Sequence, residues 1–69
     1  MPLSMMKPGC VCRVKRVLGN DAVRRHLGDM GFVEGAEVTV VSELAGNLIL
    51  GIRETRVALD AGLAARILV

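Results

Sequence analysis

The amino-acid sequence predicts a mainly β fold, a small five-stranded barrel with one short inserted α-helix at about residues 21–30. Five short segments alternate apolar and polar side chains with the period of two that is typical of half-buried strands, and turn residues separate them. After the first segment, apolar residues recur at spacings of four and three, which is the period of a helical stripe. Strands this short in a chain of 69 residues favour a closed barrel.

The first strand is predicted at residues 10–18, CVCRVKRVL. Alternate residues from Cys10 to Val14 form its inward face, and basic residues occupy much of the other. The alternation slips after Val14, because the next apolar residue is Val17 and not Arg16. A bulge or bend is therefore expected at this point.

The helix is predicted from Asp21 to Met30, where Val23, Leu27 and Met30 lie on one stripe. Asn20 or Asp21 has the side chain that caps a helix start. The helix has about three turns, so it depends on the rest of the fold for its stability.

The stretch HLGDMGFVEG at the end of the helix holds three glycines and the only Phe of the chain. Gly31 is predicted to end the helix in a left-handed conformation, with Phe32 packing back on Leu27 as in a Schellman cap. Gly35 falls at the third place of a turn, where a type II turn requires positive φ. Gly28 lies inside the helix, where glycine costs about 1 kcal/mol relative to Ala. We attribute it to a close approach between the helix and a strand.

The remaining strands are predicted at residues 36–43, 47–53, 56–60 and 65–69. Gly46-Asn47 is the predicted hairpin turn between the first two of these, and Glu54-Thr55 reverses the chain again. Residues 61–64, AGLA, are expected to form a single irregular or 3₁₀ turn.

Length and composition predict one domain over residues 1–69, with more apolar side chains than so small a core can hide. The chain is 52% hydrophobic, and apolar surface left exposed marks a contact site, either for a partner or for a weak homo-oligomer. No apolar run approaches the roughly 20 residues of a membrane span, and no leader pattern opens the chain. With only two cysteines, the expected setting is the reducing cytoplasm.

The charges are concentrated in the first part of the chain. Opposite charges at i,i+4, Asp21 with Arg25 and Arg25 with Asp29, predict ion pairs on the helix. The net charge of +2 is too small to argue for nucleic acid by itself. Five of the nine basic residues fall within thirteen positions: Arg13, Lys15, Arg16, Arg24 and Arg25.

Residues for catalysis are scarce. There is one His, no Tyr, and no Ser or Cys in a recognisable nucleophile setting. The glycines of residues 28–35 lack the preceding strand and following Lys of a phosphate-binding loop. We therefore expect no enzyme and no resident cofactor.

Cys10, Cys12 and His26 are the weak candidates for metal ligands, because thiolates and imidazole suit Zn²⁺. No fourth ligand stands at a recognisable spacing. We interpret Cys12 as a small core side chain, Cys10 as a partly exposed thiol and His26 as a residue beside solvent. No tight metal site is expected.

Small barrels often bind RNA, so nucleic acid is the main competing partner on fold grounds. Single-strand binding uses aromatic stacking platforms, and this chain has one Phe, already assigned to the helix cap. The basic cluster is interpreted as a solvated face or as a surface that meets an acidic protein.

These segments together resemble the FeoA family, small cytosolic proteins of bacterial ferrous iron transport. LGDMGFVEGAEVTVV resembles the family core "RLxxLGLxPGxxVxVV", and PLSMMKPG resembles its opening "LSxLKPG". VKRVLG is similar to its first barrel strand, and VALDAGLAARILV to its closing "IALRxxxAxxIxV". The resemblance covers essentially the whole chain.

The resemblance implies an SH3-like barrel with an inserted helix, whose partner is the cytosolic G-protein (GTPase) region of a FeoB-like membrane transporter. It also implies a cytoplasmic protein, peripheral to the inner membrane through that partner, with at most weak or transient Fe²⁺ binding. Arg24 and Arg25 are the best-supported partner-facing residues, and Arg13 and Lys15 are further candidates. The structural residues of the motif are Leu27, Gly31, Phe32 and Gly35.

Two departures from the family pattern stand out. Glu34 replaces the usual Pro, and the connection at residues 45–47 is shorter than the family's and lacks its "Gly-Asp-Pro". Two alternatives remain: a free-standing metal-regulation module related to the SH3-like C-terminal domain of DtxR-type repressors, and a small RNA-binding barrel.

Overall fold

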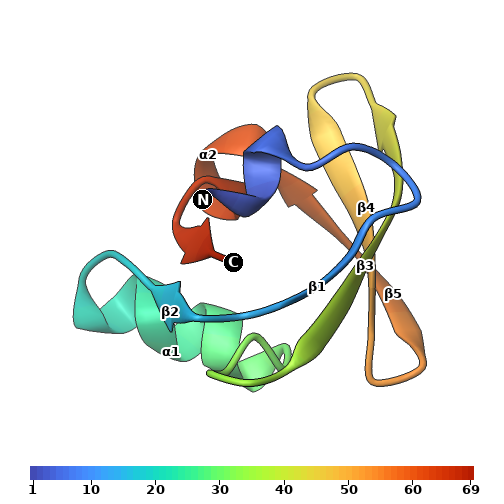
Figure 1. Ribbon diagram of the computed structural model, residues 1–69. Coiled ribbons are helices and arrows are strands. Elements are labelled where there is room, and N and C mark those ends of the chain that lie inside the picture. Colours follow the sequence, from blue (N-terminus) through green and yellow to red (C-terminus); the bar gives the residue numbers. More distant parts are fainter.

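Two antiparallel sheets and two helices make up the fold in the computed structural model, which describes residues 1–69 (Figure 1). The predicted mainly β barrel with a short inserted helix is confirmed. In chain order, the elements are a 3₁₀ turn η1 (Leu3–Met5), β1 (Val11–Arg13), β2 (Arg16–Val17), α1 (Asp21–Asp29), β3 (Glu37–Leu44), β4 (Asn47–Ile52), β5 (Thr55–Asp60), α2 (Ala61–Ala64) and β6 (Ile67–Leu68).

The larger sheet has the strand order β1-β3-β4-β5, and β2 pairs with β6 in the smaller one. The two chain ends lie side by side (Figure 1). The backbone N–H of Val69 donates to the carbonyl of Met1 at 2.8 Å, and Pro2 bridges Leu68. The barrel is therefore closed by contacts between the first and last residues of the chain.

The predicted first strand divides into β1 and β2, so there are six strands where the sequence predicts five. The break falls at the slip in alternation. The N–H of Val14 donates to the carbonyl of Ala36, just before β3 of the larger sheet, at 2.9 Å, whereas the N–H of Lys15 donates to that of Leu68 in the smaller sheet at 2.7 Å. One strand thus bends from one sheet to the other, as expected.

Helix α1 begins with the predicted cap, since the Asn20 side chain accepts a hydrogen bond from the Val23 N–H at 2.9 Å. The predicted i,i+4 ion pairs of Arg25 are wrong. The ion pair on this helix joins Arg24 to Asp21, with 3.8 Å between Nη1 and Oδ1. Asp21 is the first residue of α1, and Arg24 follows it at i,i+3. Side chains at this spacing are also neighbours on the helix surface.

The end of α1 is the predicted Schellman cap. Gly31 has a φ of 105°. Its N–H donates to the Gly28 carbonyl at 2.9 Å, and the Phe32 N–H donates to the Leu27 carbonyl at 3.0 Å. These are the two bonds that define the motif, and Leu27 and Phe32 are both buried.

Gly35 also has the predicted backbone conformation. Its φ is 86°, and the Ala36 N–H donates to the Val33 carbonyl at 3.0 Å. Positive φ at the third place and a bond closing four residues are the features of a type II turn. This turn directs the chain into β3.

Both hairpin turns lie one residue earlier than predicted. Ala45-Gly46 joins β3 to β4, with φ values of 52° and 82°, and Arg53-Glu54 joins β4 to β5, with φ values of 50° and 63°. Positive φ at both central residues is typical of a type I′ turn, which matches the twist of paired strands. This geometry lets Asn47 and Thr55 enter the strands, so the predicted turns at Gly46-Asn47 and Glu54-Thr55 are wrong by one position.

Residues 61–64 form a short α-helix, α2, and not the predicted irregular turn. The Asp60 side chain accepts a hydrogen bond from the Leu63 N–H at 2.8 Å, which caps the helix start. The last strand is correspondingly shorter than predicted, because β6 begins only at Ile67.

One apolar cluster fills the barrel, and no polar side chain is buried. The predicted inward positions of the strands are largely confirmed, although Val57 is only half-buried. The cluster consists of Leu3, Val14, Leu27, Phe32, Val38, Val40, Leu48, Leu50, Ile52, Leu59, Ala64, Ile67 and Val69.

The predicted close approach at Gly28 is wrong. A Cβ atom built on Gly28 meets no atom within 4 Å, so no strand presses on the helix there. At Gly31, by contrast, a Cβ would lie 3.0 Å from Nε of Arg53 and 3.1 Å from its Cδ. The physical reason for glycine therefore differs between Gly28 and Gly31, although both lie near the end of the helix.

We expect opposite effects from the same substitution at these two positions. Gly28→Ala should stabilise the protein by about 0.5–1 kcal/mol, because the backbone there is helical and a methyl group has room. For a domain of this size that raises the Tm by about 4 °C. Gly31→Ala should destabilise it by about 1–2 kcal/mol, since L residues are strained at this φ. Thermal and urea unfolding measure the stability of both variants. An unchanged or lower Tm for Gly28→Ala would contradict the conclusion that a methyl group has room at Gly28.

Candidate functional site

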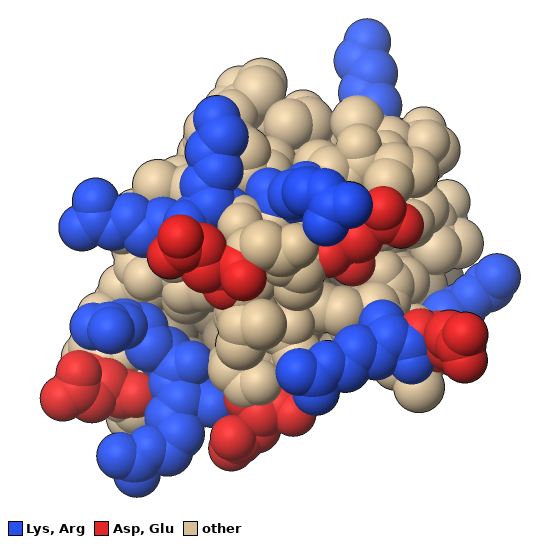
Figure 2. Space-filling view, turned by 60° about the horizontal axis from the view of Figure 1, so that its bottom comes forward, with Lys and Arg blue, Asp and Glu red and all other residues tan.

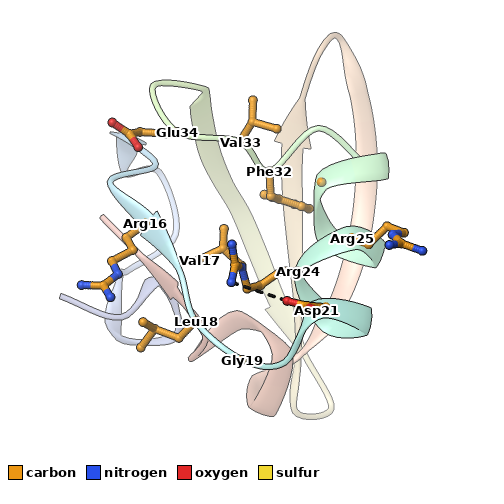
Figure 3. A pocket seen from close by; sticks show the side chains of 11 residues that line it. Arg16, Val17, Leu18, Gly19, Asp21, Arg24, Arg25, Phe32, Val33 and Glu34 are labelled. Atoms are coloured by element: carbon orange, nitrogen blue, oxygen red, sulfur yellow. Dashed lines mark ion pairs between the residues drawn. The ribbon is translucent and has the colours of Figure 1, made fainter.

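The main depression on the surface is a groove of about 650 Å³ between α1, β2 and the segment after the helix (Figure 3). We call it the α1 groove. It is lined by residues 16–19, 21, 24, 25, 28 and 32–34. Segments from before, within and after the helix thus form one concave surface.

The apolar part of the α1 groove combines buried and exposed side chains. Phe32 is 1% exposed and is anchored in the core by the helix cap. Leu18 and Val33 are 39% and 44% exposed, although both are large and apolar. Gly28 borders the same space, where the missing side chain leaves the groove open.

Arginines from two elements surround the apolar part. Arg24 projects from α1 into the groove, beside its partner Asp21 (Figure 3). Arg16 lies on the opposite side, on β2, whereas the Arg25 side chain points away from the groove (Figure 3). Three arginines against Asp21 and Glu34 give the α1 groove a positive balance.

The basic cluster of the sequence divides in space. Arg16, Arg24 and Arg25 border the α1 groove, with the Arg25 side chain turned away from it, whereas Arg13 and Lys15 do not line it (Figure 3). Arg13 instead donates to the Gly35 carbonyl at 3.0 Å and lies 3.7 Å from the Glu37 carboxylate. Arg16 is not among the predicted site residues. The slip in strand alternation could have indicated it, because β2 turns towards the helix at that point.

The surface charge is mixed. Figure 2 shows basic side chains spread over one face with acidic side chains among them, and no continuous basic surface. The only Phe, Tyr or Trp side chain, Phe32, is buried. A nucleic-acid base would therefore find no exposed ring of these three types on which to stack.

Further exposed apolar side chains lie outside the α1 groove. They are Met1, Met5, Val11 and Leu44, each 59–70% exposed. The predicted surplus of apolar surface is thus present, but only part of it lies beside the arginines of the helix.

The three weak metal candidates do not form one site. Cys10 lies with its Sγ 4.0 Å from Met6 Sδ, and Cys12 donates weakly to the Val38 carbonyl at 3.6 Å. His26 is exposed on α1. No group of three or more His, Cys, Asp or Glu side chains is arranged to hold a metal ion.

Cys12 is a thiol at neutral pH. Burial raises the pKa of its thiol above the ordinary value near 9.0, and the neighbouring Cys10 raises it further. Both cysteines are free and half-buried against the core. A raised pKa lowers the fraction of the nucleophilic thiolate.

We expect Cys12 to react slowly with iodoacetamide in the folded protein. In a Cys10→Ser variant at pH 8, alkylation should be several-fold slower than in urea, and it should accelerate as the pH rises towards the raised pKa. Burial, the larger cause of the raised Cys12 pKa, remains in this variant. Mass spectrometry at timed intervals measures both alkylation rates, and equal rates in the folded and unfolded protein would contradict the raised pKa.

Comparisons with known proteins agree over the whole chain. The family model for the FeoA domain matches residues 1–69. The structure is similar to that of an iron uptake regulatory protein (FeoA), with 34% identity, a TM-score of 0.90, and coverage of 97% of this chain and 91% of that one. It is also similar to Stenotrophomonas maltophilia FeoA complexed with zinc, an SH3 domain protein, with 32% identity, a TM-score of 0.86, and coverage of 99% and 87%.

A manganese-dependent transcriptional repressor shares the fold alone, with 21% identity, a TM-score of 0.86, and coverage of 97% of this chain and 39% of the repressor. No curated protein sequence matches the chain. The full-length family match and the two FeoA structures above 30% identity agree with the SH3-like barrel described above. The chain belongs to the FeoA family.

Proposed function

We propose that this protein is an accessory or regulatory component of bacterial ferrous iron uptake, acting by contact with the cytosolic G-protein region of a FeoB-like membrane transporter. Family membership supports the link to iron transport. The observation that carries the contact is the α1 groove, because it places exposed apolar side chains beside arginines on one concave surface.

The side chains of the α1 groove suit the docking of a partner protein better than catalysis. Its side chains are arginines, two carboxylates and aliphatic or aromatic groups, with no nucleophile and no His. Positive rims favour encounter with an acidic surface, and apolar anchors hold the complex once formed. On this proposal the protein has no catalytic turnover.

The two parts of the groove have different roles. Leu18 and Val33 are the apolar anchors, and a well-packed anchor contributes on the order of 2 kcal/mol. Arg24 and Arg25 lie at the rim, where each exposed ion pair contributes at most about 1 kcal/mol and acts mainly on the association rate. Arg13 and Lys15 are then peripheral to the contact.

We place the protein in the cytoplasm, held at the inner membrane by its partner, with residues 1–69 as one domain. None of its helices has the length and apolar character to cross a bilayer. The likeness to a manganese-dependent repressor concerns the fold, and carries no role in gene regulation for this chain.

Reversing the charge at the rim should slow binding. Arg24→Glu combined with Arg25→Glu should lower the association rate with the cytosolic region of a FeoB-like transporter by about tenfold at low salt, and flatten its salt dependence. Surface-based kinetics at two ionic strengths measure this, with circular dichroism as the folding control. Lys7→Glu combined with Lys15→Glu changes the charge equally at exposed residues that do not line the groove, and should bind normally.

Filling the groove should weaken binding without any change in charge. Gly28→Leu directs a side chain into the groove from a position where a Cβ atom has no neighbour within 4 Å. The complex should dissociate at least about tenfold faster while the circular dichroism spectrum stays the same. An unchanged dissociation rate, together with an unchanged association rate for the rim variant, would remove the α1 groove from the contact.

Metal binding by the isolated protein should be weak. The neighbouring structure of Stenotrophomonas maltophilia FeoA was complexed with zinc, but Cys10, Cys12 and His26 do not converge here. Calorimetric titration with Fe²⁺ or Zn²⁺ under reducing conditions should give dissociation constants no tighter than about 10 μM, since fewer than three protein ligands are available. A submicromolar stoichiometric site that vanishes on Cys10→Ser with Cys12→Ser would overturn this expectation.

A further inference from the structure

Strand β5 is the open edge of the larger sheet. It pairs with β4 over six continuous residue pairs, and no other strand lies on its far side. None of the backbone hydrogen bonds outside the regular elements involves residues 55–60. One row of peptide groups therefore remains available to another strand.

The turn before β5 determines which peptide groups these are. Arg53 and Glu54 both have positive φ, so Ile52 and Thr55 close a two-residue hairpin and form a hydrogen-bonded pair. Hydrogen-bonded and non-hydrogen-bonded pairs alternate along an antiparallel ladder. The N–H and C=O groups that point away from β4 are consequently those of Arg56, Ala58 and Asp60.

The edge lacks three of the features that keep edge strands of separate molecules apart, namely a bulge, Pro and Lys. The β4–β5 register has no bulge, whereas β3–β4 is shifted between Val40 and Ser42. The sequence TRVALD contains no Pro and no Lys. Protected edges commonly carry such residues or a bulge, so this strand is open to addition.

The side chains of β5 are complementary to a reversed copy of themselves. Arg56, Ala58 and Asp60 alternate along one exposed face, with opposite charges on either side of a small residue. A two-fold axis through Ala58 places Arg56 of each copy opposite Asp60 of the other. Opposite charges at directly facing positions stabilise a pair of strands, and like charges destabilise it.

We propose that β5 pairs with β5 of a second copy of this chain, antiparallel and centred on Ala58. This register is the one that joins outward-pointing peptide groups at all three positions and pairs both sets of opposite charges. Two four-stranded sheets then form one continuous eight-stranded sheet, and the half-buried Val57 of one copy lies opposite Leu59 of the other. One strand from each side buries a small area, so the dimer is weak, with a dissociation constant on the order of 0.1–1 mM.

This contact is separate from the α1 groove. No residue of β5 lines that groove. A dimer formed through β5 thus leaves both grooves free, and one particle presents two docking sites, which strengthens binding to a partner that is itself multivalent.

Sedimentation equilibrium of the whole protein between about 20 μM and 1 mM tests the proposal, alongside ¹⁵N spectra over the same range. We expect a monomer–dimer equilibrium, with concentration-dependent amide shifts centred on residues 56–60. A protein that stays monomeric at 1 mM, or shifts that centre on the exposed Met1, Met5 and Leu44 or on the α1 groove, would overturn it.

Two variants act on different parts of the contact. Ala58→Pro removes an N–H that points away from β4, a position where an edge strand tolerates Pro, and should abolish association. Arg56→Glu places like charges opposite each other twice and should weaken the dimer at least about tenfold. Lys7→Glu is the control, with the same change in charge on an exposed residue outside β5. Circular dichroism checks folding, and association unchanged in Arg56→Glu and in a folded Ala58→Pro would refute the β5 pairing.

Discussion

The left-handed end of α1 is the constraint on which the rest of this small barrel depends. Gly31 turns the chain so that Leu27 and Phe32 both enter the core from the two sides of one cap. The Arg53 side chain, from the opposite hairpin, lies over Gly31, where a Cβ atom would come within 3.0–3.3 Å of it. The last turn of the helix thus lies against the β4–β5 hairpin, and its cap contributes Leu27 and Phe32 to a core of thirteen residues.

Features that depend on neighbouring residues were predictable from the sequence. The Asn20 cap and the left-handed Gly31 and Gly35 follow from short spacings that require no knowledge of the fold. Features decided by distant segments were not. Both hairpin turns lie one residue earlier than predicted because strand pairing extends to Asn47 in one hairpin and to Thr55 in the other. The strand alternation predicted the small barrel, the family resemblance added its SH3-like type, and the slip in alternation indicated the break after β1.

The candidate site was predictable only in part, because a groove is made by segments that the sequence keeps apart. Arg24 came from the basic cluster, but Leu18 and Val33 become neighbours of α1 only when β2 pairs with β6 and the cap turns the chain. The predicted reason for Gly28, a close approach to a strand, is wrong. A sequence shows that a glycine is present, but it does not show whether the absent side chain is replaced by a neighbour or by open space.

Gly28 connects the stability of this protein with its proposed contact. Glycine within a helix costs about 1 kcal/mol, a large share of the 5–15 kcal/mol that separates a folded domain from its unfolded chain. Neither positive φ nor a packed neighbour requires glycine there, in contrast to Gly31. The remaining physical consequence of the missing side chain is space beside Phe32 in the α1 groove. Because the helix cap already fixes Phe32, a partner that enters this space meets a preorganised surface and loses little entropy in ordering it.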